Sequence, residues 1–543
     1  MTIVDKKNQN IIVIVSLLLL AVIVQGLFID VTRDSGKYAS IAKEIFTNGN
    51  WLNLTIHGEP YLQKPPFMFW LSAISFKIFG ISNFSFKFPL FLFSMAGLYF
   101  VYRLGKSLYN AKIGIISAVL LLFSEYFLLY NMDIHTDTLL MPLTTFSIWQ
   151  LSEFIRKNKT RYILGAATGI GLAMLTKGPI GAVIPAFAIG SHLILTKQFK
   201  RFFDRRWIIL IVTCSIIITP LLWSLYEQFG TEGIKFYFWT NNIGRITGQY
   251  LGTNHDYLFF FHTLLYMLLP WSLLFFISTY NEFSRIIKKR IHATEFFTTG
   301  GIWIFLIIMS FSRSKLPNYI YALSPLMAIV TAKWIYFSLK SNSVKLNSIF
   351  KYSQLATEFV IWTLILATST FLFPFKNTIS LVLLLFIFIL YIYFRHRIKI
   401  PHYYFVSTAV SMLILTVVLN FHIFPEIYSQ QAVPKAARLF NQISEKNDRL
   451  YNYKYGQYEL YFYGNRSVNN IDNTNELAET IQSGNAWIFT NEKGFGEIKK
   501  LPLTTKQDTV FTFRHASLNK GLRYINPKTR EKSKETMYLL HYK

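Results

Sequence analysis

WIILIVTCSIIITPLLWSLY, residues 207–226, contains no charged side chain and decides the class of fold. Runs of roughly 17–25 apolar residues have the length that crosses a bilayer as a helix. The basic segment 197–206 precedes this run, as the positive-inside rule predicts for a cytoplasmic loop. Cys214, the single cysteine of the chain, lies inside the run, so a disulfide framework and a multi-cysteine metal site are excluded.

The composition of the whole chain agrees with a membrane protein. Of the 543 residues, 52% are hydrophobic and 17% aromatic, and only 15% are charged, against about 25% in soluble domains. Soluble enzymes, disordered chains and fibrous chains are therefore excluded. The net charge of +27 sits on this apolar background, so we attribute it to membrane topology and anionic lipid rather than to nucleic acid.

Twelve further stretches have the same character, which predicts thirteen membrane-spanning helices. Most basic residues fall in alternate loops, which places the N-terminus inside and, after an odd number of crossings, the C-terminus outside. The first run follows Lys6 and Lys7 and lacks a small-residue cleavage site, so we expect a retained anchor. The runs are 11–29, 84–102, 113–130, 138–155, 162–176, 179–196, 207–226, 257–279, 296–312, 318–338, 355–373, 377–394 and 403–422.

The chain is expected to divide into a membrane part, residues 1–424, and a C-terminal part, residues 425–543. The C-terminal part has no spanning run, and its short aromatic or β-branched stretches alternate with helical ones, which predicts a small extracytoplasmic α/β domain. Two predicted external loops, 30–83 and 227–256, are too long to be turns, and the apolar segment 67–79 within the first predicts a helix in the membrane interface. Such loops are where function concentrates.

Ionisable side chains collect at the outer ends of the predicted helices. Arg and Lys at headgroup depth suit a phosphate on a lipid, because they make charge-assisted hydrogen bonds to its oxygens. A neighbouring carboxylate can take a proton from an attacking hydroxyl, and the cations stabilise a departing phosphate. The pattern predicts group transfer from a lipid phosphate, and the absence of a phosphate-binding glycine loop disfavours a nucleotide. The residues are Asp34, Lys64, Asp133, His135, Asp137, Lys177, Arg245, Arg313, Lys315 and Tyr319.

Each of these residues also has a structural interpretation. Asp34 and Asp137 are placed to cap the helices that follow them. The lysines are placed to anchor the chain at the interface with their charged ends in water, and His135 fits a hydrogen-bonded interface residue better than a metal ligand. The functional interpretation is favoured because all these groups fall on one face.

Six motifs give the chain a resemblance to a known family. DSGKYA (34–39), GNW (49–51) and YLQKPP (61–66) resemble the first external loop of the bacterial lipid A aminoarabinose transferases. Asp137, TKGP (176–179) and SKLPNY (314–319) match further segments in the same order. These enzymes and the protein O-mannosyltransferases form part of the GT-C group. The resemblance covers residues 1 to about 340. The last three predicted helices match by topology alone, and the tail matches in position and in its predicted α/β character.

The resemblance implies a GT-C fold and an integral membrane enzyme that takes a sugar from a polyprenyl phosphate with inversion. By the same resemblance Asp34 is the catalytic carboxylate and Asp137 the second acidic residue of the site. It also assigns carrier-phosphate contacts to Lys64, Arg245 and Tyr319, and we add Lys177 and Lys315 to this set from their position.

The chain departs from the family at two positions. Metal-binding members have a glutamate immediately before the lysine and a histidine in the second long loop. Gln63 and Asn242 stand there, and a neutral amide is a poor substitute for either ligand. We therefore expect no metal, no other cofactor and metal-independent transfer.

The expected function is transfer of a monosaccharide from undecaprenyl phosphate to a lipid A-type glycolipid or another envelope acceptor. The expected location is a bacterial inner membrane, with the site and the C-terminal domain in the periplasm. Protein O-glycosylation is the alternative within the class. A polyprenyl-lipid transporter would need ionisable pairs near the midplane and often has repeated halves, neither of which the sequence contains, and a structural scaffold would not need the external Asp–Lys–Arg set.

Overall fold

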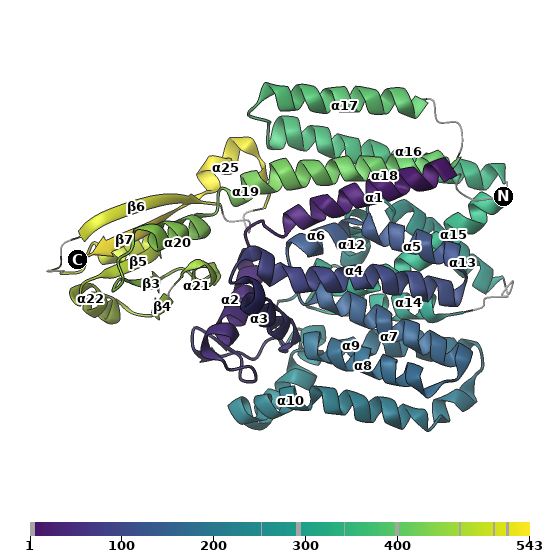
Figure 1. Cartoon of the computed structure of the whole chain (residues 1–543), viewed down its shortest axis with the longest axis horizontal. Helices are drawn as coiled ribbons and strands as arrows, with labels where there is room; N and C mark the ends of the chain where they lie inside the picture. The colour runs from purple at the N-terminus through teal and green to yellow at the C-terminus, as the bar shows by residue number, and fades with distance from the viewer. Residues whose placement is uncertain are drawn as a thin grey trace.

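The protein is a bundle of helices with a sheet at one end (Figure 1). The computed structural model describes residues 6–250, 252–288, 295–341, 343–396, 401–465, 468–502, 505, 507–516 and 521–543. The helices of the bundle lie side by side with their long axes roughly parallel, and the loop helices α2 and α3 stand at the same end as the sheet (Figure 1). That end is where the candidate site forms.

The first half of the bundle is built from helices that short turns connect. Helix α7 is almost entirely buried, because α4, α8 and α9 pack around it. Polar side chains fix several helix starts: Ser82 and Ser85 form a capping box at α4, and Asn110 caps α5. The helices are α1 (Lys6–Gly26), α4 (Asn83–Leu108), α5 (Ala111–Leu122), α6 (Glu125–Met132), α7 (Asp137–Lys157), α8 (Thr160–Lys177), α9 (Ile180–Leu195), the 3₁₀ helix η1 (Phe199–Phe203) and α10 (Arg206–Lys235).

The second half of the bundle packs onto the first through α14 against α9, α15 against α5 and α18 against α1. Helices α16, α17 and α18 form a layer at the margin of the bundle (Figure 1). The elements are α12 (Phe259–Met267), α13 (Ser272–Ile287), α14 (Phe297–Phe311), η3 (Pro317–Leu323), α15 (Ser324–Lys340), α16 (Val344–Ala367), η4 (Thr368–Leu372), α17 (Thr378–His396), α18 (Pro401–Val418), η5 (Leu419–Ile423) and α19 (Phe424–Tyr428).

The prediction of thirteen spans is not confirmed. Among the described residues, five helices are long and apolar enough to cross a membrane, or six if the bent pair α5 and α6 is one span. Other predicted spans are shorter or broken: the run 257–279 divides into α12 and α13, and the chain bends by 52° between α5 and α6. Five shorter apolar helices accompany the long ones. A multi-pass membrane protein is nevertheless indicated.

Both predicted external loops contain ordered structure. Segment 30–83 forms α2 (Arg33–Asn48), the two-stranded β1 (Thr55–Ile56) and β2 (Glu59–Pro60), and α3 (Phe67–Phe79). The second loop begins later than expected, because α10 continues past residue 226 to Lys235, with a break at Gly230, which has a φ of 60°. A π turn, η2 (Phe236–Thr240), and α11 (Ile243–Thr247) follow.

The C-terminal part contains a five-stranded sheet with the order β4-β3-β5-β7-β6. Strands β3, β4 and β5 are parallel, and β7 pairs antiparallel with β5 and β6. The elements are α20 (Ala432–Ile443), β3 (Arg449–Tyr453), α21 (Glu459–Tyr463), β4 (Val468–Ile471), α22 (Thr474–Gln482), β5 (Ala486–Asn491), α23 (Glu492–Ile498), β6 (Gln507–His515), α24 (Leu522–Ile525), α25 (Pro527–Ser533) and β7 (Glu535–Tyr542).

Helices cover both faces of this sheet, which explains the continuous apolar sequence of β5. Trp487 and Phe489 face a core that they share with α20, whereas Ile488 faces a core formed with α22 and α23. Alternate residues of a strand point to opposite faces, so a strand buried on both sides has no polar face. The predicted α/β character of this region agrees with the sheet.

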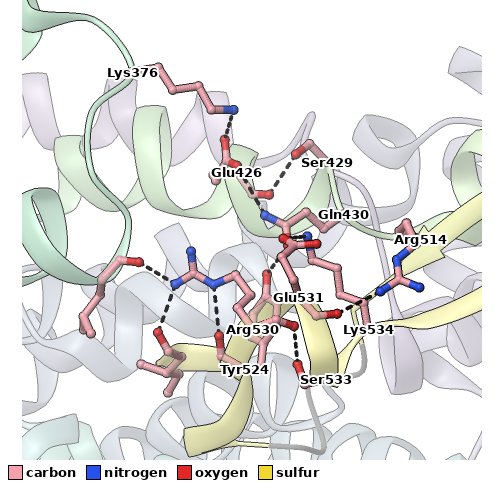
Figure 2. Close-up of polar contacts among 12 residues, drawn as sticks. Lys376, Glu426, Ser429, Gln430, Arg514, Tyr524, Arg530, Glu531, Ser533 and Lys534 are labelled. Carbon is pink, nitrogen blue, oxygen red and sulfur yellow. Dashed lines mark hydrogen bonds and ion pairs between the residues drawn. The ribbon is translucent and has the colours of Figure 1, made fainter. Parts of the chain in front are cut away.

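The C-terminal part is joined to the bundle by a network of polar contacts (Figure 2). The guanidinium of Arg530, on α25, donates to the carbonyl of Leu372 and lies 4.0 Å from the ring centroid of Phe373. The hydroxyl of Tyr524 donates to Gln430 at 3.1 Å. The first contact joins α25 to the η4 turn that follows α16, and the second joins α24 to the segment that follows α19, so the sheet is fixed against the helices.

Candidate functional site

Asp137, the first residue of α7, and Lys177, the last residue of α8, form a buried ion pair. The Lys177 ammonium lies 2.5 Å from one carboxylate oxygen of Asp137, and the Asn318 amide donates to the other at 2.7 Å. The Asp137 side chain is fully buried. Both of its oxygens are therefore engaged by side chains from other elements, and the helix-capping role is not the one that the structure assigns to Asp137.

Arg245 and Tyr319 meet beside this pair. The Arg245 guanidinium donates to the Tyr319 hydroxyl at 2.7 Å and to the Asn241 side chain at 2.9 Å. The Lys177 ammonium lies 4.9 Å from the centroid of the Tyr319 ring. Tyr319 thus contacts both cations and holds them at one place.

The loop that carries Arg245 is held by backbone hydrogen bonds. The amide of Arg313 donates to the carbonyl of Ile246 at 3.0 Å, and the amide of Ser314 donates to the carbonyl of Arg245 at 3.0 Å. Segment 312–315 therefore runs alongside the loop and fixes the position of the Arg245 backbone. The SKLPNY motif supplies both this support and Tyr319.

These residues form the polar end of a cavity of about 330 Å³. Its walls change character along their length, because the rest of the lining is almost entirely apolar and comes mainly from α9 and α14. The polar end comprises Lys64, Lys177, Asn241, Asn242, Arg245 and Tyr319, and the apolar part includes Ile180, Val183, Phe187, Phe305, Ile308 and Met309. The cavity therefore fits a ligand with an anionic head and a hydrocarbon tail.

The pKa of Lys64 depends on the other cations of the cavity. Burial lowers the pKa of Lys64, and the positive charges of Lys177 and Arg245 lower it further, to about 7. An anionic ligand would reverse the second effect, because an opposite charge favours the protonated ammonium. Three cations gathered around one cavity indicate a site for a negatively charged group.

Asp34 lies in the first turn of α2. Its carboxylate is 3.0 Å from the Lys37 ammonium, and its side chain is 54% exposed. Burial alone would raise the pKa of Asp34, but Lys37, His135 and Lys64 lower it below its ordinary value. The carboxylate is therefore ionised and accessible at neutral pH, as a general base must be.

The helix that bears Asp34 is fixed to the bundle by its neighbour Ser35. The Ser35 hydroxyl is 2.7 Å from an Asp133 carboxylate oxygen and 2.8 Å from the carbonyl of Ile134. Asp133 in turn pairs with His135 at 3.2 Å. The polar residues predicted at 133–135 therefore support Asp34, which agrees with the structural interpretation of His135.

Three predicted site residues do not line the cavity: Asp34, Asp137 and Lys315. Asp137 contacts it through Lys177, whereas Lys315 bonds the backbone of a loop. Its ammonium donates to the carbonyl of Asn254 at 2.8 Å and lies 5.6 Å from the Tyr257 ring centroid. The residues that the prediction missed are Asn318 and Asn241. Their positions in the sequence could have identified them, because Asn318 adjoins Tyr319 and Asn241 lies four residues, about one helical turn, before Arg245.

Gln63 and Asn242, the two positions at which the chain differs from the metal-binding relatives, lie beside the cavity. The Asn241 amide donates to the carbonyl of Gln63 at 3.1 Å, and the Asn242 amide donates to the carbonyl of Tyr237 at 2.7 Å. Within the described ranges, no group of three or more His, Cys, Asp or Glu side chains is arranged to hold a metal ion.

Sequence comparisons link this chain to lipid-dependent glycosyltransferases. Residues 63–223 match the family described as dolichyl-phosphate-mannose-protein mannosyltransferase. An undecaprenyl phosphate-alpha-4-amino-4-deoxy-L-arabinose arabinosyl transferase of Wigglesworthia glossinidia brevipalpis is 26% identical over 58% of this chain and 57% of its own length. An uncharacterised protein of Aquifex aeolicus is 27% identical over 62% of this chain and 64% of its own length. The chain thus spans less than two thirds of the length of these relatives.

Structural comparison extends the similarity to the whole fold. ArnT from Cupriavidus metallidurans bound to undecaprenyl phosphate superposes with a TM-score of 0.77, covering 97% of both chains at 15% sequence identity. The apo state of the same protein gives a TM-score of 0.75. Together the comparisons confirm the predicted resemblance to GT-C glycosyltransferases of the aminoarabinose transferase type.

Proposed function

We propose that this chain is a membrane glycosyltransferase that moves a monosaccharide from undecaprenyl phosphate to an acceptor in the cell envelope. The observation that carries the proposal is the cavity with cations at one end and apolar walls along the rest. A soluble phosphate ester would not need the apolar part, and a neutral lipid would not need the cations. The printed activity of the Wigglesworthia relative and the undecaprenyl phosphate bound to the Cupriavidus protein support the same donor class.

In this proposal the donor phosphate lies between Lys64, Lys177, Arg245 and Tyr319, and its isoprenoid chain follows α9 and α14 out of the cavity. Asp34 accepts the proton of an acceptor hydroxyl. The hydroxyl oxygen attacks the anomeric carbon from the side opposite the phosphate, the bond from that carbon to the phosphate oxygen breaks, and the configuration inverts. The cations stabilise the charge that remains on the leaving phosphate.

For Asp137 we propose a role other than the catalytic one that the resemblance implies. Its two carboxylate oxygens accept hydrogen bonds from Lys177 and Asn318, and its side chain is fully buried, which favours a positioning role over direct proton transfer. We assign it the role of a positioning residue that orients Lys177 toward the cavity. Lys315, which bonds the loop backbone, is likewise assigned to holding the loop that carries Arg245.

The acceptor is proposed to be a lipid A-type glycolipid or another envelope glycan, with protein O-glycosylation as the alternative. Mass spectrometry of envelope glycolipids and glycoproteins from a deletion strain distinguishes them, because only the true acceptor loses a sugar. Purified enzyme supplied with the sugar-charged carrier should release undecaprenyl phosphate when acceptor is added. A transporter would leave the carrier charged, which would contradict the proposal.

The site and residues 425–543 are proposed to face the periplasm of a bacterial inner membrane. The sheet lies at the same end of the bundle as α2 and α3 (Figure 1). Lys64, which lines the cavity, stands just before α3, so one topology measurement locates both the sheet and the cavity. Reporter fusions after residue 424 should give periplasmic activity. Cytoplasmic activity there would overturn the location of the site as well.

We expect the transfer to proceed without a metal ion. Lys64, Lys177 and Arg245 supply the positive charge that a leaving phosphate needs, and Gln63 and Asn242 are poor ligands. Turnover should survive exhaustive chelation. Loss of activity that added Zn²⁺, Mg²⁺ or Mn²⁺ restores would refute this expectation.

A further inference from the structure

A second cavity, of about 560 Å³, lies between α16, α17 and α18. Lys351 is near the start of α16, whereas the other end of that helix and the η4 turn after it reach Leu372, which contacts the C-terminal part. Twenty-one residues of helix span about 30 Å. The Lys351 end of the cavity therefore lies toward the opposite face of the membrane from the proposed catalytic site.

An ion pair with one unused donor forms the polar end of this cavity. The Arg395 guanidinium donates through Nε to Glu358 at 2.9 Å, and the two side chains are 10% and 4% exposed. The hydroxyl of Thr408 donates to the other Glu358 oxygen at 3.0 Å. The Nη2 atom of Arg395 is shielded from solvent and has no hydrogen-bond partner among the described residues. A buried, unpaired donor of a charged group is costly, which calls for a partner.

A second cation lies close to Arg395. The Arg395 guanidinium is 4.1 Å from the Tyr404 ring centroid, and the Lys351 ammonium is 5.9 Å from the same centroid. Of the described residues that line the cavity, Lys351 and Arg395 carry two positive charges and Glu358 carries one negative charge. These residues leave a net positive charge that a phosphodiester would balance.

The remaining walls are apolar, and the cavity borders the lipid-facing side of the bundle. Leu355, Trp362, Phe388 and Ile392 line it, and Phe359, which also lines it, is 74% exposed. In a membrane such an exposed side chain contacts acyl chains, so the cavity is reached from the bilayer. A free anion would leave these walls unfilled.

We propose that this cavity binds an anionic glycerophospholipid, with its phosphodiester on Arg395 Nη2 and Lys351 and part of an acyl chain along α16 and α17. The charge-assisted hydrogen bonds hold the phosphodiester, the two cations disfavour a headgroup that adds a positive charge, and the apolar walls select a lipid over a free phosphate. The site is separate from the cavity that carries the proposed function, so the two proposals stand or fall independently.

Native mass spectrometry of the purified full-length protein tests the proposal. Delipidated protein is offered phosphatidylglycerol, phosphatidylcholine with the same acyl chains, and inorganic phosphate. We expect phosphatidylglycerol to be retained at least about tenfold better than phosphatidylcholine, because phosphatidylcholine has the same phosphodiester but adds a choline cation, which Lys351 and Arg395 repel. Equal retention of the two lipids would overturn the proposal. Displacement of phosphatidylglycerol by inorganic phosphate or by undecaprenyl phosphate would overturn the identity of the ligand.

Lys351→Ala should reduce the retention of phosphatidylglycerol about tenfold. Lys345→Ala is the matched control, because Lys345 is on the same helix, is exposed and does not line the cavity. The control should retain the lipid as the wild type does, and an equal loss in both variants would mean non-specific attraction and contradict the proposal. Arg395→Lys, which keeps a charge for Glu358 but removes Nη2, should also lose selectivity. If Arg395→Lys fails to fold, the comparison of Lys351→Ala with Lys345→Ala tests the proposal by itself.

Discussion

At the scale of single residues, the charge states of Asp34 and Lys64 suit the proposed chemistry, and neighbouring positive charge has opposite effects on them. Asp34 is kept ionised by neighbouring positive charge, whereas Lys64 is made easier to deprotonate by burial and by the same kind of charge. One residue is thereby a base at neutral pH, and the other binds an anion most strongly when that anion restores its proton. Each property gives a measurable expectation.

Asp34→Asn should reduce turnover by about 10²–10⁴-fold, the usual size of a general-base contribution. Asparagine keeps the size of the side chain and its capacity to stabilise a helix start, so the loss isolates the carboxylate. Single-turnover transfer with purified protein measures it. Near-normal turnover in a well-folded variant would reduce Asp34 to a structural residue.

Binding of undecaprenyl phosphate should weaken as the pH rises through about 7, the pKa of Lys64. The sign follows from the depressed pKa: the ammonium is present below that pH and lost above it, and the phosphate prefers the charged form. Dissociation constants between pH 6 and 9 check this. Lys64→Arg keeps its charge over the whole range, so its affinity should show no such decline; an unchanged profile in that variant would assign the titration to another group.

At the scale of elements, α7 and α8 are held together at the site by Asp137 and Lys177. The sequence places each at a helix end facing the same side of the membrane, but their pairing depends on how the two helices pack. Because the pair is buried, its two members should be coupled in stability. Stability should depend on the Asp137–Lys177 pair, whereas donor binding should depend on Lys177 itself.

Asp137→Ala should destabilise the protein by about 3–5 kcal/mol, because it leaves the Lys177 charge buried without its partner. The double variant Asp137→Ala/Lys177→Met should recover much of that stability while donor binding stays weak. Thermal unfolding and donor affinity, measured on the same preparations, separate the two effects. Recovery of donor binding in the double variant would contradict a carrier-phosphate role for Lys177.

At the scale of the whole molecule, the C-terminal part contacts α2, the helix that carries Asp34, the proposed base. Arg33, the residue before Asp34, has a φ of 53°, a conformation that costs energy in a non-glycine residue. Its backbone amide donates to the carboxylate of Glu459 on α21. The same helix is held at Ser40, whose hydroxyl donates to the carbonyl of Tyr458 at 2.9 Å. The C-terminal part therefore supports the local backbone that aims Asp34.

Glu459→Ala should lower kcat at least tenfold with little change in KM for the donor, because Asp34 loses its orientation while the cavity is untouched. Arg33→Gly in the same protein should restore part of the activity, since glycine adopts a positive φ without strain. Steady-state kinetics of the single and double variants check this. Failure of glycine to rescue, with folding intact, would show that Glu459 acts otherwise than through the Arg33 backbone.

The sequence by itself determined the membrane class, the C-terminal α/β character and most of the cavity cations. Apolar run length and charge asymmetry are local properties that the bilayer imposes directly, and the motifs around Lys64, Lys177 and Tyr319 are contiguous. It overestimated the number of long helices, because apolar composition does not reveal where a span breaks, as it does between α5 and α6.

Only the tertiary structure decided which charges meet. Asp137 and Lys177 are 40 positions apart, and Asn318 lies 181 positions from Asp137, yet they form one cluster. Lys315 has the same charge as Lys177 and a similar motif, but it bonds the backbone of Asn254 instead. The reason is that a side chain's partner depends on helix packing and loop path, which join distant segments through contacts that no local pattern encodes.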